Sequence, residues 1–129
     1  MRDSLANLIR PVVLVVDDDH IIRTVLGQGL GLYGFGVYLA GDGNEGLDVY
    51  RQRRSEINLV LLDICMPGLD GLQVLRTLRR ENPGVPCCFM TGHIGVHTEE
   101  QLLSMGAEYV FEKPFSLLEV AAKLTEILR

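Results

Sequence analysis

The chain has 129 residues, enough for one domain with a single hydrophobic core and too few for two. Hydrophobic residues make up 47% and charged residues 22%, with a mean hydropathy of +0.20, which excludes a disordered chain. The formal charge of -5 and the pI near 5.1 give no net positive field, so we expect this domain to bind neither nucleic acid nor a membrane surface directly.

The cysteine pattern indicates a reducing compartment. Cys65, Cys87 and Cys88 are odd in number and two of them are adjacent, which is a poor basis for a disulfide framework. Residues 1–11 lack the apolar core of a signal peptide, and no apolar stretch reaches the roughly 20 residues of a spanning helix. We therefore expect a cytoplasmic protein.

Short apolar runs alternate with helical periodicities from residue 12 onward. Residues 12–16 predict a buried strand, and the apolar spacing from His20 predicts a helix despite three glycines within it. A second strand follows at residues 36–40, and Asn44 is the expected N-cap of the next helix. The second half repeats the alternation, with strands at 59–62, 87–90 and 109–112 and helices at 71–80, 98–105 and after a Ser116/Glu119 capping box.

This alternation predicts an α/β fold. Right-handed crossovers let every strand run the same way, which gives a parallel sheet with helices on both faces. The domain is expected to span residues 12–129, with residues 1–11 as an N-terminal tail. Ligands of such sheets bind beyond the carboxyl ends of the strands.

Polar residues follow the carboxyl ends of four predicted strands. They are Asp17, Asp18 and Asp19 after the first, then Asp63, Thr91 and Lys113 after the third, fourth and fifth. Converging carboxylates repel one another unless a cation lies among them, and Mg²⁺ suits a site of few oxygen ligands that also holds phosphate. An ionised aspartate can attack phosphorus and form an acyl phosphate if Mg²⁺ and a lysine neutralise the transferring group.

Four segments in order, VVDDDH, LLDICMPGLDG, FMTGH and EKPF, resemble the signatures of the response-regulator receiver domain, over residues 12–129. The resemblance implies a doubly wound (βα)5 flavodoxin-like fold with strand order 2-1-3-4-5. It implies that Asp63 is the phosphoacceptor, assisted by Thr91 and Lys113, with a cis peptide between Lys113 and Pro114. It also implies four Mg²⁺ ligands: Asp17, Asp18, Asp63 and the backbone carbonyl of Cys65.

The resemblance implies a switch module of a two-component phosphorelay that phosphorylates and dephosphorylates itself, rather than a turnover enzyme. Its expected partners are a sensor histidine kinase or phosphotransfer protein, a downstream effector or output domain, and a phosphorylation-dependent second copy. Two alternatives stay open. One is an interaction-only pseudo-receiver, and the other is an aspartate-nucleophile phosphatase, because Asp17-x-Asp19 matches the nucleophile motif of haloacid-dehalogenase-type enzymes.

Several residues also have simpler interpretations. Asp19 is expected to be a helix N-cap, outside the metal site. His93 and His97 have the separation of zinc ligands on a helix but lie in a glycine-containing loop, which disfavours zinc. Receivers usually carry Tyr or Phe three residues before the lysine, where this chain has Val110. Two arginine groups are expected on solvated helix faces: Arg51, Arg53 and Arg54, and Arg76, Arg79 and Arg80.

Overall fold

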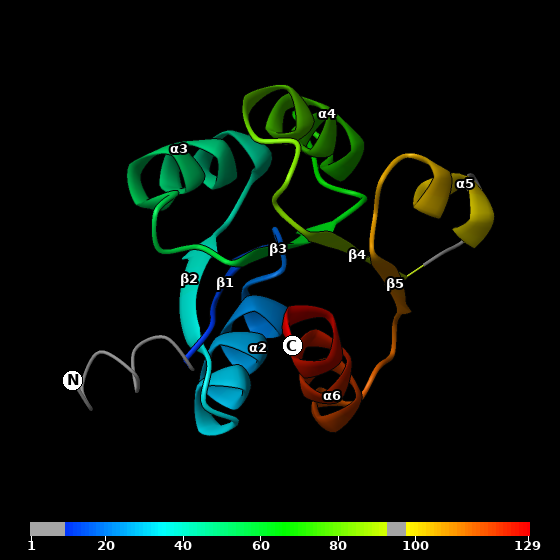
Figure 1. The fold of residues 1–129 in the computed structure, drawn as a ribbon. Coiled ribbons are helices and arrows are strands. Elements are labelled where there is room, and N and C mark those ends of the chain that lie inside the picture. The colour runs from blue at the N-terminus through cyan, green and yellow to red at the C-terminus, as the bar shows by residue number, and fades with distance from the viewer. Residues whose placement is uncertain (1–9, 93–97) are drawn as a thin grey trace.

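The computed structural model describes residues 10–92 and 98–129 (Figure 1). Its centre is a five-stranded parallel sheet in the order β2-β1-β3-β4-β5, which confirms the predicted fold class and strand order. The strands are β1 (Val12–Val16), β2 (Gly36–Ala40), β3 (Leu59–Asp63), β4 (Cys87–Thr91) and β5 (Tyr109–Glu112). The helices are α2 (His20–Leu32), α3 (Gly43–Arg53), α4 (Gly71–Glu81), α5 (Glu99–Ser104) and α6 (Leu117–Leu128).

Helices cover both faces of the sheet, with α2 and α6 on one face and α3 and α4 on the other (Figure 1). Successive strand residues point to opposite faces, so Leu14 and Val16 pack toward α3 and α4 while Val13 and Val15 pack toward α2 and α6. All four side chains are fully buried, which is why β1 is a continuous β-branched and leucine run instead of an alternating one.

Helix N-caps were largely readable from the sequence. The Asp19 carboxylate accepts hydrogen bonds from the Ile21 and Ile22 amides, which confirms its role as a cap, and Ser116 forms the predicted capping box. The prediction for Asn44 was wrong. The cap is Asp42, two residues earlier, and helix α3 begins at Gly43, because Asp42 Oδ1 accepts the Glu45 amide proton at 2.8 Å.

A close helix contact explains one of the glycines of α2. A Cβ atom at Gly29 would overlap the side chain of Leu117, so a glycine here lets α2 and α6 approach each other across their shared face. At Gly31 nothing lies within 4 Å of the equivalent position. The helix therefore tolerates the unfavourable propensity of glycine for a packing reason at one of these positions and not at the other.

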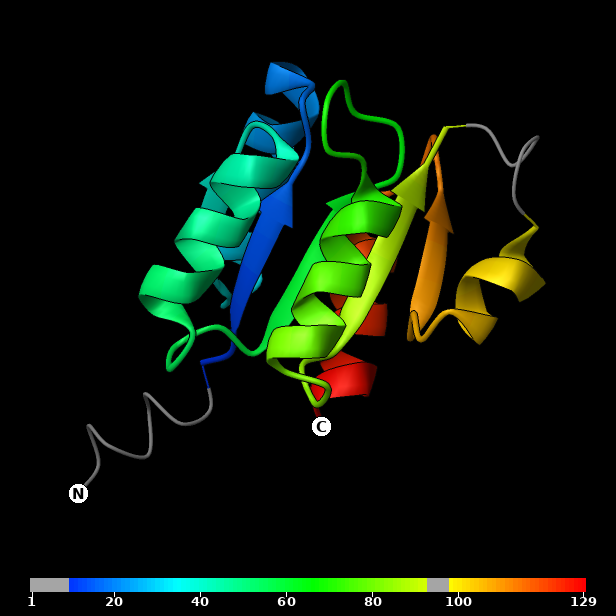
Figure 2. The same cartoon turned by 90° about the horizontal axis from the view of Figure 1, so that it is seen from above.

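The strand register places the carboxyl ends of neighbouring strands, which carry the polar residues, at the same height in the sheet. Val16 pairs with Leu62 and Asp63 pairs with Met90, so Asp17 and Asp63 lie level on adjacent strands. Thr91 pairs with Glu112, which places Lys113 one residue beyond the β5 end. Figure 2 shows the strand arrowheads directed toward this one edge.

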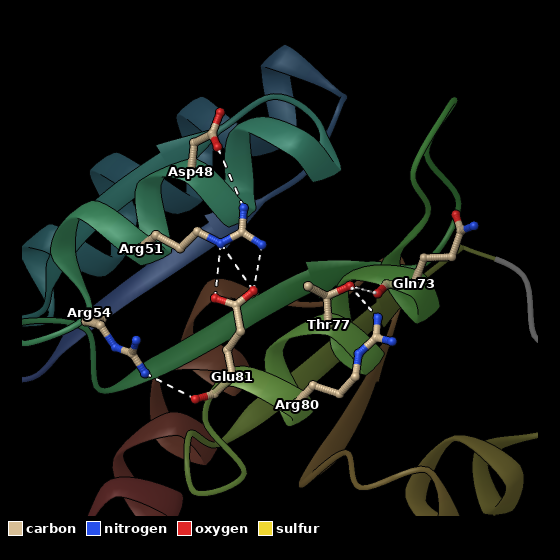
Figure 3. A network of polar contacts seen from close by, with 7 residues as sticks. All are labelled: Asp48, Arg51, Arg54, Gln73, Thr77, Arg80 and Glu81. Carbon is tan, nitrogen blue, oxygen red and sulfur yellow. Dashed lines mark hydrogen bonds and ion pairs between the residues drawn. The ribbon is translucent and has the colours of Figure 1, made fainter.

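Two of the arginines predicted on helix surfaces, Arg51 and Arg54, link α3 to the end of α4. Arg51 of α3 donates three hydrogen bonds to the Glu81 carboxylate of α4, the shortest at 2.6 Å from Nη2 to Oε2, and Arg54 donates to the Glu81 carbonyl at 3.2 Å (Figure 3). Arg76 and Arg80 are exposed, as predicted for a solvated face. The same prediction was wrong for Arg79, which is half-buried and donates to the Val85 and Gly106 carbonyls. No helix within residues 10–92 and 98–129 has both the length and the apolar character needed to cross a membrane.

Candidate functional site

Asp17, at the end of β1, is fully buried, and each of its polar groups has a partner. Its amide donates to the Ala40 carbonyl at 3.1 Å, and its Oδ1 accepts the Asp19 amide proton at 2.8 Å. Its Oδ2 accepts a hydrogen bond from Lys113 Nζ at 3.3 Å, and its carbonyl accepts one from Arg23 at 2.7 Å. The backbone and the carboxylate of Asp17 are thus both fixed in orientation.

Asp63 lies at the centre of the cluster and is 5% exposed. Lys113 Nζ lies 3.6 Å from its Oδ1, so a single ammonium serves both Asp63 and Asp17. Burial, together with the negative charge of Asp17, raises the pKa of Asp63 to about 7, and the Lys113 ammonium only partly offsets these effects. Without a further cation, the carboxyl group is therefore only partly ionised near neutral pH.

The carboxylates of Asp17, Asp18 and Asp63 converge as the sequence predicts. One oxygen from each lies within 4.8 Å of the others, with Asp18 exposed and the other two buried. An all-oxygen cluster whose charges exceed the available ammonium fits a hard divalent cation such as Mg²⁺. The backbone carbonyl of Cys65 stays a prediction as a fourth ligand. The Cys65 side chain is exposed just beyond β3.

Thr91 and Lys113 occupy the next two strand ends. Thr91 is 2% exposed at the end of β4, and its carbonyl accepts the Lys113 amide proton at 2.7 Å. The Lys113–Pro114 peptide bond is cis, as the resemblance implies. The two residues are therefore backbone neighbours at the edge where Asp63 ends its strand.

The segment after Asp63 is held by Gly71, which the sequence analysis did not single out. The Gly71 amide donates to the Ile64 carbonyl at 3.0 Å, and a Cβ atom on Gly71 would overlap the Asp63 carbonyl oxygen. Only glycine allows this approach of α4 to the end of β3. The sequence contained one signal for this contact. Gly71 directly follows the N-cap Asp70, at the first position of α4.

Arg23 was also missed. It lies four residues after the Asp19 N-cap, in the first turns of α2, and binds the backbone of Asp17. The sequence did contain a signal for Arg23. A cation near the N-terminus of a helix is unfavourable, so its presence there indicates a contact elsewhere in the protein.

Val110 occupies the position where the family usually has an aromatic ring. It is 6% exposed and belongs to the core on the α3 and α4 side, next to Phe89 on the neighbouring strand. Tyr109 and Phe111 lie on the opposite face, as strand alternation predicts, with ring centroids 4.9 Å apart. No aromatic ring of β5 therefore faces the same side as Val110. His93 and His97 lie outside the described residues.

A family profile for the response regulator receiver domain matches residues 13–125. The chain belongs to this family. The receiver is 39% identical over 117 residues to the response regulator MprA of Mycolicibacterium vanbaalenii, and 38% identical over 117 residues to that of Mycobacterium avium. Each alignment covers 91% of this chain and 50% of the relative, so the receiver spans about half the length of these relatives.

Solved receiver structures share the fold. A CheY-like receiver domain from Methanospirillum hungatei is 28% identical with a TM-score of 0.83, covering 92% of this chain and 94% of that one. A chain in the CheX-CheY-BeF3-Mg complex from Borrelia burgdorferi is 25% identical with a TM-score of 0.86, covering 92% and 90%. The fold of this receiver is therefore that of CheY-like proteins.

Proposed function

We propose that the receiver accepts a phosphoryl group on Asp63 in a Mg²⁺-dependent reaction and passes the change to a downstream protein. The observation that carries this proposal is the placement of the Asp63 carboxylate, buried at the strand edge with two further aspartates and one ammonium around it. A relative solved with BeF3 and Mg supports the same chemistry. Asp17, Asp18, Asp63 and the Cys65 carbonyl would hold the cation.

In this mechanism an Asp63 oxygen attacks phosphorus, an oxygen–phosphorus bond forms, and the bond from phosphorus to the donor's leaving group breaks. A cation held by Asp17, Asp18 and Asp63 would neutralise charge on the phosphoryl oxygens and would favour the ionised form of Asp63. Lys113 lies 3.6 Å from Asp63 Oδ1 and would pair with a phosphoryl oxygen after transfer. The Thr91 hydroxyl would donate a hydrogen bond to another oxygen.

The donor in this proposal is a sensor histidine kinase or a phosphotransfer protein, and the phosphorylated state is read by an effector protein or an output domain. The relatives support this assignment because they are response regulators about twice as long as this chain. The receiver then acts as a two-state element whose equilibrium the phosphoryl group shifts, and turnover of a substrate is not its role.

Incubation with acetyl phosphate and Mg²⁺, followed by intact mass spectrometry, tests the proposal. We expect the wild-type receiver to gain the mass of one phosphoryl group in the presence of Mg²⁺ and to stay unmodified with EDTA. Asp63→Asn is the matched variant, because it keeps the shape of the side chain and removes the nucleophile. Modification that persists in Asp63→Asn would reject the assignment of the acceptor.

A further inference from the structure

Arg23 lies near the N-terminus of α2, and interactions within the helix do not favour an arginine there. Its amide donates to the Asp19 carbonyl at 3.0 Å, which is the first backbone bond of α2, so the side chain belongs to the opening turns of the helix. The positive end of a helix dipole disfavours a cation there. The reason for the arginine therefore has to lie in a tertiary contact.

That contact is the peptide bond that joins the two acids after β1. Arg23 Nη1 donates to the Asp17 carbonyl at 2.7 Å, and this carbonyl belongs to the Asp17–Asp18 peptide. Nη2 lies 3.3 Å from His20 Nδ1. A Cβ atom on Gly41 would lie 3.2 Å from Nη1, so the guanidinium rests against the backbone that follows β2. The arginine is thus held between the ends of β1 and β2.

We propose that Arg23 is a positioning residue that orients the Asp17–Asp18 peptide, and through it both carboxylates, for cation binding. The other polar groups of Asp17 are already fixed by Ala40, Asp19 and Lys113. Asp18 is exposed, and its direction depends on the rotation of the peptide that Arg23 holds. A guanidinium has only donors, so Arg23 acts on the ligands and is not one of them.

The sign of its effect on Mg²⁺ affinity separates this role from a purely electrostatic one. A positive charge beside the site repels a divalent cation, so loss of the charge alone would strengthen Mg²⁺ binding. Loss of the hydrogen bond to the Asp17 carbonyl would weaken it, because the carboxylates lose their common orientation. A substitution that removes both the charge and the hydrogen bond therefore shows, by the direction of the change in Mg²⁺ affinity, which effect is larger.

The test is a titration of the receiver with MgCl2 at constant ionic strength, followed by amide chemical shifts. We expect Arg23→Gln to weaken Mg²⁺ binding about 10-fold or more, in the range found for residues that orient metal ligands. Arg23→Lys keeps the charge and one donor but loses the planar fork, so we expect an intermediate affinity. Arg76→Gln, an equal charge change on the exposed face of α4, is the control and stays within about twofold of the wild type.

Thermal unfolding of each variant checks that it is folded, and if Arg23→Gln is not, Arg23→Lys decides. Mg²⁺ binding by Arg23→Gln as tight as, or tighter than, that of the wild type overturns the proposal. This inference rests on the proposed function. Mg²⁺ binding by the wild type distinguishes a failure of the metal site from a failure of the role of Arg23. A wild-type receiver that binds no Mg²⁺ at millimolar concentration contradicts the metal site itself, whereas normal wild-type binding with unaltered Arg23 variants contradicts only the role of Arg23.

Discussion

Lys113 Nζ lies 3.6 Å from Asp63 Oδ1. Lys113 directly follows β5, and Asp63 is the last residue of β3. The same ammonium contacts Asp17 Oδ2 at 3.3 Å. Of the two carboxylates that share it, Asp17 is fully buried and Asp63 nearly so. Lys113 is therefore placed both to favour the ionised form of Asp63 and to stabilise charge on a group transferred to it.

Replacing Lys113 with alanine tests this double role. We expect phosphorylation by acetyl phosphate to slow about 100-fold, because the preorganised charge that meets the phosphoryl oxygens is lost. The pKa of Asp63 rises further, since Lys113 lowers it in the wild type. Lys123→Ala, which removes a lysine paired with Glu126 on α6, is the matched control and keeps the wild-type rate. A Lys113→Ala rate within twofold of the wild type would contradict this role.

The raised pKa of Asp63 makes the stability of the metal-free receiver depend on pH. Its pKa of about 7 in the folded protein exceeds the ordinary aspartate value of about 3.9, so the folded state favours the protonated form. This contribution to stability is fully present below about pH 4 and is lost as the pH rises through 7. Between pH 5 and pH 8 we expect the free energy of unfolding to fall by roughly 1–3 kcal/mol relative to Asp63→Asn.

Urea unfolding of the wild type and Asp63→Asn in EDTA at pH 5 and pH 8 measures this difference. Subtracting the variant removes the contributions of the other titrating groups. Adding Mg²⁺ at pH 8 restores stability to the wild type, because the cation binds the folded state and favours the ionised carboxylate. Equal pH profiles for the two proteins would show that Asp63 titrates as an ordinary aspartate.

Gly71→Ala is expected to destabilise the receiver. The added methyl group would overlap the Asp63 carbonyl, so α4 or the segment after β3 must move, at a loss of roughly 1–3 kcal/mol of unfolding free energy. Gly31→Ala, in open space on α2, is the control and should stabilise by about 0.5–1 kcal/mol. Urea unfolding compares them, and similar values for both variants would mean that the close approach at Gly71 has no energetic weight.

The fourth prediction concerns Val110 and how phosphorylation of Asp63 is coupled to the rest of the protein. Val110 is buried next to Phe89, and the rings of Tyr109 and Phe111 face the other side, so no β5 ring is available on the side where the family usually has one. We expect coupling through backbone movement at the ends of β4 and β5. Amide shifts around Val110 on adding beryllofluoride and Mg²⁺ measure it, and an absence of change there would reject this route.

The sequence predicted the fold and most of the site because both depend on local patterns. Buried strands appear as short apolar runs, and the residues after them must share one edge when every strand is parallel. Asp17, Asp18 and Asp63 were brought together for that reason. The cap of α3 was misassigned because Asp42 and Asn44 are both good N-caps, and the choice depends on where Gly43 packs against Leu69.

The parts that were not predictable depend on tertiary contacts. Gly71 and Arg23 touch backbone atoms of residues on other elements, and no spacing along the chain encodes these approaches. Both residues oppose local preference, since one places glycine in a helix and the other places a cation at a helix N-terminus. Such local conflicts mark positions where tertiary contacts decide the residue.

The position of the phosphoryl group on the chain tests the function most directly. Borohydride reduction after treatment with acetyl phosphate and Mg²⁺ converts an aspartyl phosphate to homoserine, which peptide mass spectrometry locates. The expected result is conversion at Asp63 alone, and only when Mg²⁺ is present. Conversion at Asp17 with Asp63 unmodified would contradict the receiver mechanism and favour a phosphatase-like nucleophile on β1.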